Sequence, residues 1–143
     1  MTANPIKVVL VDDHAAVRAG FRLLLESAGD IEVVAEMESG EEINQQISKI
    51  SVDVIIMDIS MSGMGGLEAI RRVRLKNTKV RVLVFTMHDN VAFVEQALDV
   101  GADGYITKNN AGNILIEAIR KVANGETFIE PKMAEQLSMR QNL

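Results

Sequence analysis

Short apolar segments alternate with helix-like periodicity five times along this chain, and this alternation limits the fold more than any other feature. After each segment, apolar residues recur three or four positions apart, as they do along one face of a helix. Five strand–helix units with right-handed crossovers predict a doubly wound parallel sheet that is covered by helices on both faces. The predicted strands are residues 6–11, 31–37, 52–58, 80–85 and 105–106.

The second predicted strand differs from the others in its pattern. Its apolar residues alternate with Glu32 and Glu36, which is typical of a strand at the edge of a sheet. A strand order of 2-1-3-4-5 puts it at an edge and brings strands one and three together at the topological switch point. We therefore expect one five-stranded α/β domain with that order.

The end of the chain has a different character from the rest. Gly125 ends the last predicted helix, and Pro131 follows, ahead of a weakly amphipathic stretch at residues 133–139. With 143 residues and 48% hydrophobic residues, the chain can form one domain with a real core. We predict a domain at residues 1–125 and, at residues 126–143, a linker or the start of a connecting helix.

Composition excludes several classes of protein. The net charge is −5 and there is no basic run, so direct binding of nucleic acid or of an anionic membrane by this chain is not expected. The chain has no cysteine, which excludes disulfides and thiolate metal sites. We see neither a signal-peptide layout nor an apolar run of about 18 residues, so we expect a soluble, intracellular, cytoplasmic protein.

The third predicted strand stops on a carboxylate, Asp58, and the chain then turns through Ser60 and a group of glycines. The carboxyl ends of strands are where open α/β sheets place their ligands and chemistry. We interpret Asp58 as the reactive residue. The alternative is that Asp58 only caps the next helix.

Asp12 and Asp13 follow the first strand, so they should face Asp58 across the switch point. Three carboxylates in one crevice repel each other and need a cation between them. Oxygen ligands favour a hard ion, and Mg²⁺ is the usual one in sites that also bind phosphate. The alternative is that Asp12 and Asp13 cap the first helix, although capping needs only one carboxylate.

Two further polar residues end neighbouring strands. Thr86 ends strand four and Lys108 follows strand five, so both should reach the same rim. A hydroxyl and an ammonium group are suited to hold the equatorial oxygens of a phosphoryl group in transfer. Either residue alone is ordinary, but together with the three acids they indicate phosphoryl chemistry.

With these residues at these positions, the sequence resembles a known family, the receiver domains of two-component response regulators. The resemblance covers residues of about 5–125 and rests on the segments 9–14, 56–61 and 101–108. These segments look most like the NarL/FixJ subfamily, in which a LuxR-type helix-turn-helix output domain follows the receiver. The implied fold is the flavodoxin-like (βα)5 receiver fold.

The resemblance implies a role for each matched residue. Asp58 would be the phosphoacceptor, and Asp12, Asp13, Asp58 and the backbone carbonyl of Ser60 would hold Mg²⁺. Thr86 and Lys108 would bind the phosphoryl oxygens. Tyr105 would be the aromatic switch that turns inward when Thr86 moves toward the phosphate.

The resemblance also implies partners. A sensor histidine kinase would supply the phosphoryl group, and phosphorylation would change contact with the absent LuxR-type output domain or pairing with a second receiver. The parent protein would bind DNA and regulate transcription. The chain itself would be a phosphoacceptor with self-catalysed transfer and autodephosphorylation, not a conventional enzyme.

A few positions depart from the family pattern or have no assigned role. Ser62 stands where proline is usual, and the glycines around it predict a mobile loop after Asp58. His14 and His88 lie at the rim, where a histidine either tunes the site or is simply solvated. In this family, Ser60 and His88 lie at positions that flank the water route to the acyl phosphate.

Three rival functions compete with this interpretation. A haloacid-dehalogenase-type phosphatase would have a second aspartate where Ser60 stands. A flavodoxin-like cofactor binder would have a glycine-rich loop where Asp12 and Asp13 stand. The third rival, a receiver fold that works as an interaction module without phosphorylation, stays open from sequence alone.

Overall fold

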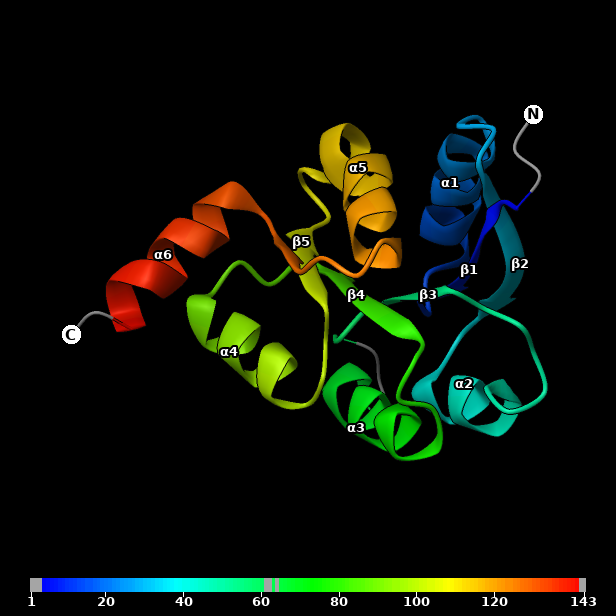
Figure 1. Ribbon diagram of the computed structural model, residues 1–143, viewed down its shortest axis with the longest axis horizontal. Helices are drawn as coiled ribbons and strands as arrows, with labels where there is room; N and C mark the ends of the chain where they lie inside the picture. Colours follow the sequence, from blue (N-terminus) through cyan, green and yellow to red (C-terminus); the bar gives the residue numbers. More distant parts are fainter. Residues whose placement is uncertain (1–3, 61–62, 64, 142–143) are drawn as a thin grey trace.

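The fold is a parallel six-stranded sheet with the strand order β2-β1-β3-β4-β5-β6 (Figure 1). The structure is a computed structural model, which describes residues 4–60, 63 and 65–141. The strands are β1 Ile6–Val11, β2 Ile31–Met37, β3 Val54–Met57, β4 Arg81–Thr86, β5 Gly104–Thr107 and β6 Phe128–Ile129. The predicted fold class and the order of the first five strands are confirmed. The short sixth strand was not predicted.

Helices cover both faces of the sheet. They are α1 Ala15–Glu26, α2 Gly40–Gln46, α3 Gly66–Lys76, α4 Val91–Asp99, α5 Ala111–Ala123 and α6 Pro131–Gln141. Figure 1 shows α1 and α5 on one face and α2, α3 and α4 on the other. Alternate residues of each strand fill the two resulting cores, so that Val9 and Ile55 belong to one and Leu10 and Ile56 to the other. None of the described helices is both long and apolar enough to cross a membrane.

The register of the central strands brings their carboxyl ends together. Val11 on β1 lies opposite Met57 on β3, and these are the last residues of the two strands. The next residue on each chain segment continues the ladder, because Asp58 donates its backbone N–H to Val11 O at 3.0 Å and Asp12 donates to Met37 O at 3.0 Å. The two aspartates therefore leave the sheet side by side.

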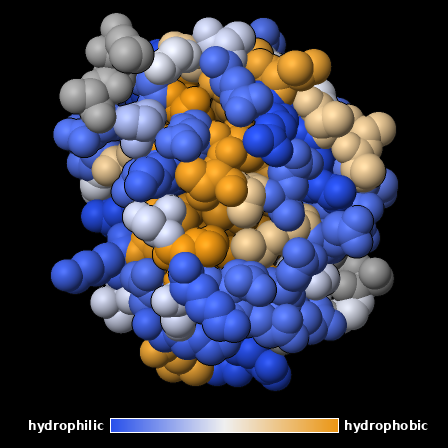
Figure 2. All heavy atoms as spheres, turned by 90° about the vertical axis from the view of Figure 1, so that its right-hand side faces the viewer, coloured by the Kyte–Doolittle hydropathy of each residue, from blue (hydrophilic) through white to orange (hydrophobic). Residues whose placement is uncertain are grey.

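The edge of the sheet at β2 is protected by charge. Figure 2 looks at the side that carries β2, α1 and α2, and shows apolar side chains in the middle with hydrophilic ones around them. Val34 on β2 is 37% exposed, but Glu36 on the same strand accepts hydrogen bonds from Arg18 and Arg22 of α1. Charged groups along an edge strand discourage pairing with another strand. The edge position predicted for residues 31–37 is confirmed.

Two local features fix the loops that follow the strands. Ser39 Oγ accepts the backbone N–H of Glu42 at 3.1 Å, and Glu42 Oε1 accepts the N–H of Glu38 at 3.1 Å, so these two side chains cap the start of α2. At the start of α3, a Cβ on Gly66 would lie 2.4 Å from the carbonyl oxygen of Asp58. Only glycine lets α3 begin this close to the end of β3.

Residues 128–141 pack against the rest of the molecule, and we call them the C-terminal strap. Phe128 and Ile129 pair in parallel with Gly104 and Tyr105 of β5. The strap then forms α6, which lies beside α4 (Figure 1). Met133 of α6 is fully buried in the core on the α4 side. The boundary expected at residue 125, and the expectation of a linker beyond it, stay predictions.

Replacing Met133 by alanine should lower the free energy of unfolding by about 2–5 kcal/mol, because it removes a fully buried side chain and leaves a cavity. Met139→Ala on the same helix is the control. Its side chain is 65% exposed, and its effect should stay within about 0.5 kcal/mol. Urea unfolding measures both values, and equal effects would show that α6 is not held in the folded unit.

Candidate functional site

The candidate site lies at the carboxyl ends of β1 and β3, where acidic side chains gather. Asp58 is fully buried and Asp12 is almost so, whereas the side chain of Asp13 is about one third exposed. Ligand atoms of Asp12, Asp13, His14 and Asp58 all lie within 4.8 Å of one another. The structure thus brings together the three carboxylates that the sequence placed at the switch point.

Lys108 carries the positive charge that faces these carboxylates. Its Nζ lies 2.6 Å from Asp12 Oδ2 and 2.9 Å from Asp58 Oδ2. The ammonium group also lies 5.2 Å from the centre of the Phe85 ring. Burial lowers the pKa of Lys108, but the hydrogen bonds to Asp12 and Asp58 outweigh burial and leave the pKa raised. Lys108 is therefore a fixed cation at neutral pH.

Asp58 is held by hydrogen bonds on both carboxylate oxygens. Oδ1 accepts from the backbone N–H of Ser60 at 2.9 Å and from its hydroxyl at 2.7 Å, while Oδ2 accepts from Lys108. Burial raises the pKa of Asp58, but these hydrogen bonds, with Ser60 N–H first among them, leave it lowered overall. The carboxylate is thus ionised and oriented, which is the state in which it can act as a nucleophile.

Helix capping does not account for these aspartates. The residue before α1 is His14 and the residue before α3 is Gly65, and neither helix has a capping hydrogen bond from a side chain there. Asp12 Oδ1 instead accepts the N–H of His14 at 2.8 Å, within the turn that precedes α1. The capping alternative therefore fails for Asp58, and for Asp12 it reduces to one turn contact.

Thr86 and Tyr105 are joined through the loop after β4. Both side chains are fully buried. The Tyr105 hydroxyl donates to the backbone carbonyl of His88 at 2.7 Å, and the N–H of His88 donates to Thr86 Oγ1 at 3.4 Å. Burial, followed by the nearby negative charges of Asp89, Asp58 and Glu130, raises the pKa of Tyr105, which keeps the phenol neutral. The tyrosine lies inward in this structure.

Arg18 and Phe85 had no role predicted from the sequence, and two alternatives were left for His14. The structure shows contacts for all three residues. Arg18 donates from Nη1 to the backbone carbonyl of Asp12 and from Nε to Glu36 at 3.3 Å, so it ties the first turn to β2. The ring of Phe85 lies against the ammonium group of Lys108. The position of Phe85 directly before Thr86 in the sequence could have indicated that it lies near the site. The side chain of His14 is 63% exposed, and its Nδ1 also lies 3.0 Å from a carboxylate oxygen of both Asp12 and Asp13, so both interpretations of this residue stay open.

Part of the loop after β3 lies outside the described residues. Ser62 is among the residues not described, and so are Met61 and Met64, so the expected mobility of the loop is untested. For Ser60, the described contacts are those of its N–H and its hydroxyl with Asp58. The role expected for its carbonyl as a metal ligand stays a prediction.

The charges of the site determine what it can bind. Three carboxylates face one ammonium group, so the crevice keeps an excess of negative charge. Oxygen donors at this spacing suit a hard divalent cation with bound water. A cation there, with Lys108, would surround a phosphoryl group on Asp58 with positive charge.

Comparison with known proteins identifies the family. Residues 8–120 match the response regulator receiver domain. The match covers more than half of the chain, and this chain therefore belongs to the family of response-regulator receiver domains.

Individual relatives agree with this assignment. The chain is 39% identical to the transcriptional regulatory protein DegU of Brevibacillus brevis and 38% identical to the response regulator UvrY of Escherichia coli strain K12. The matched regions are 94% and 95% of this chain, but only 57% and 62% of those two proteins. The chain thus spans about three fifths of the length of these relatives.

Solved structures show the same fold. A two-component response regulator of the LuxR family from Aurantimonas sp. SI85-9A1 matches with a TM-score of 0.93 and 34% identity, over 98% of this chain and 100% of that one. The isolated REC domain of RcsB from Salmonella enterica serovar Typhimurium, with phosphomimetic BeF3-, matches with a TM-score of 0.85 and 28% identity. That match covers 94% of this chain and 99% of that one.

The lowered pKa of Asp58 predicts how acid affects stability. The ionised carboxylate stabilises the folded state above its ordinary pKa of about 4, and this contribution is lost as the pH falls through the lower folded pKa. As the pH falls below about 4, the wild type should therefore lose stability more steeply than Asp58→Asn. Urea unfolding at a series of pH values measures both slopes. Equal slopes would show that the pKa of Asp58 is not lowered in the folded state.

Proposed function

We propose that this chain is a phosphorylation-dependent switch in which Asp58 accepts a phosphoryl group from a sensor histidine kinase. The observation that carries the proposal is the bridge from Lys108 to both Asp58 and Asp12. A buried, ionised and hydrogen-bonded carboxylate beside a fixed ammonium group fits a nucleophile that attacks phosphorus.

The proposed transfer is an in-line displacement at phosphorus, in which one bond forms as another breaks. An oxygen of Asp58 forms a bond to phosphorus while the bond from phosphorus to the imidazole nitrogen of a phosphohistidine breaks, and the electron pair leaves with the imidazole. The product is an acyl phosphate on Asp58. Lys108 can follow the new charge, because its ammonium group already contacts Asp58 Oδ2.

Mg²⁺ is the proposed cofactor, and the donor set supports it. Asp12, Asp13 and Asp58, with the backbone carbonyl of Ser60, would supply oxygen ligands of the kind this ion prefers. When bound, the ion would offset negative charge on the phosphoryl oxygens during transfer. Asp12 and Asp13 would hold the ion beside Asp58. The ion would offset the negative charge that Lys108 alone does not neutralise.

Switching would follow from the charge that phosphorylation adds. An acyl phosphate brings between about 1.5 and 2 negative charges and new acceptor oxygens. Thr86 can donate its hydroxyl to one of these oxygens, and its present contact with His88 N–H is long enough to be exchanged. Tyr105 is bonded to the same loop through the His88 carbonyl, so movement at Thr86 would reach Tyr105 and then α4.

The function proposed for the parent protein goes beyond this chain. The relatives named as regulators are longer, and RcsB has been solved as two dimers bound to two parallel DNAs. We propose a LuxR-type helix-turn-helix output domain in the parent protein, control of transcription through it, and a receiver homodimer. The expected place is the cytoplasm. Self-catalysed transfer and autodephosphorylation would make the chain a phosphoacceptor rather than a conventional enzyme.

Incubation with acetyl phosphate and Mg²⁺ should add one phosphoryl group to the wild-type chain, as measured by intact mass. Asp58→Asn should remain unmodified, because the amide is not a nucleophile of comparable strength. Asp99→Asn, which removes an exposed carboxylate at the end of α4, should be modified as the wild type is.

Two results would refute the proposed function. Modification that persists in Asp58→Asn would move the phosphoacceptor elsewhere. A wild-type chain that takes no phosphoryl group from the donor with Mg²⁺ present would favour the third rival, an interaction module that works without phosphorylation.

A further inference from the structure

The C-terminal strap contains a buried carboxylate that the phosphoryl chemistry does not use. Glu130 is 4% exposed. Its Oε1 accepts hydrogen bonds from the backbone N–H of Thr107 at 3.3 Å and from the Thr107 hydroxyl at 3.0 Å, and Oε2 lies 3.3 Å from the same hydroxyl. Within the described part of the chain, these are the side-chain hydrogen bonds of Glu130. A buried carboxylate is costly to keep, so its position calls for an explanation.

The residue that Glu130 holds is next to the lysine of the site. Thr107 is the last residue of β5 and precedes Lys108 directly. On the other side of β5, Thr107 lies opposite Thr86, and Lys108 donates its backbone N–H to Thr86 O at 2.7 Å. The backbone that carries Lys108 is therefore fixed from two sides, by β4 and by the strap.

A second contact joins the strap to the tyrosine switch. Glu130 donates its backbone N–H to Tyr105 O at 3.0 Å, while the Tyr105 side chain is bonded to the His88 carbonyl. A pocket of about 180 Å³ lies at this junction and is lined by residues from all three segments that meet there: Asp89, Thr107, Asn109, Asn110, Glu130 and Lys132. The loops after β4 and β5 thus meet the start of the strap.

The remainder of the strap is anchored on α4. Met133 is fully buried, and Ile129 and Leu137 pack against the same core. Arg140 lies 2.8 Å from Glu95 of α4, but this pair is partly exposed and contributes little. Apolar burial therefore holds α6, whereas Glu130 is the polar contact that ties the strap to the site.

We propose that Glu130 is a positioning residue that couples the C-terminal strap to the phosphorylation site. This inference rests on the proposed function and names the part of the chain that reports the state of Asp58. When Lys108 shifts toward a phosphoryl group, Thr107 moves with it and the contact with Glu130 changes. By linkage, an event that lifts the strap must also change the energetics at Lys108.

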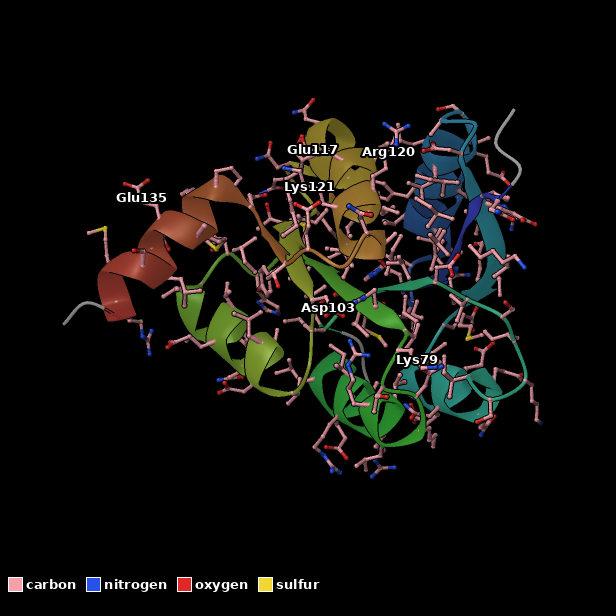
Figure 3. All side chains as sticks on the ribbon, in the orientation of Figure 1. Lys79, Asp103, Glu117, Arg120, Lys121 and Glu135 are labelled. Atoms are coloured by element: carbon pink, nitrogen blue, oxygen red, sulfur yellow. The ribbon has the colours of Figure 1, made fainter. Side chains whose placement is uncertain are left out.

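The test compares Glu130→Gln with Glu135→Gln. Both remove one negative charge from the strap, but Glu135 is exposed and points away from the rest of the molecule (Figure 3). Amide hydrogen exchange in the unphosphorylated protein should become about ten-fold faster at residues 104–110 and 126–141 in Glu130→Gln, since one charge-assisted contact is weakened. Glu135→Gln should match the wild type.

The same variants are then phosphorylated with acetyl phosphate and Mg²⁺. The rate for Glu130→Gln should fall about ten-fold, as expected for a group that orients a residue of the site. Thr107→Val should give a similar decrease, and the double variant should be no slower than either single one, because both remove the same contact. Exchange at residues 126–141 of the wild type should become faster on phosphorylation.

The outcomes separate the two proposals. One outcome is that Glu130→Gln speeds exchange at residues 126–141 but changes neither exchange at residues 104–110 nor the phosphorylation rate. That outcome would refute the proposed coupling between the strap and the site. The same follows if Glu135→Gln has an equal effect, or if Glu130→Gln and Thr107→Val slow phosphorylation additively. A wild-type chain that takes no phosphoryl group would refute the proposed function. In that case, faster exchange at residues 104–110 in Glu130→Gln would still support the coupling between the strap and Lys108.

Discussion

Repulsion between carboxylates is the constraint on which the site depends. The parallel register of β1 and β3 forces Asp12 and Asp58 to leave the sheet together, and Asp13 joins them. Two such charges 4 Å apart cost about 4 kcal/mol near a protein surface. Lys108 offsets part of this cost through its contacts with Asp12 and Asp58, but one ammonium group cannot neutralise three carboxylates. The excess charge is why a cation and a phosphoryl group are the proposed ligands.

Strand β5 connects the site with the rest of the molecule. Its last residue, Thr107, precedes Lys108 and contacts Glu130, while Tyr105 on the same strand contacts the loop after β4 through its side chain and the strap through its backbone. A shift at the end of β5 therefore reaches α4 and α6 over short paths. The proposed output of the switch follows these contacts and needs no long-range rearrangement.

Much of the fold and of the site was predictable from the sequence, for physical reasons. Buried strands are short and apolar, and residues that end parallel strands must meet at one edge, so the residue pattern alone was enough to group Asp12, Asp58 and Lys108. Phe128 and Ile129 could not be identified as a strand, because two residues carry no periodicity. The contacts of Glu130 and Arg18 depend on packing between distant segments, which residue patterns do not encode.

Among the three carboxylates of the site, we propose that Asp58 is the nucleophile. Borohydride reduction after phosphorylation identifies the modified residue, since the reagent converts an acyl phosphate on aspartate into homoserine, which peptide mass spectrometry locates. The proposed role of Asp58 predicts homoserine at residue 58, where Ser60 and Lys108 hold the carboxylate. Homoserine at residue 12 or 13, with none at residue 58, would contradict it.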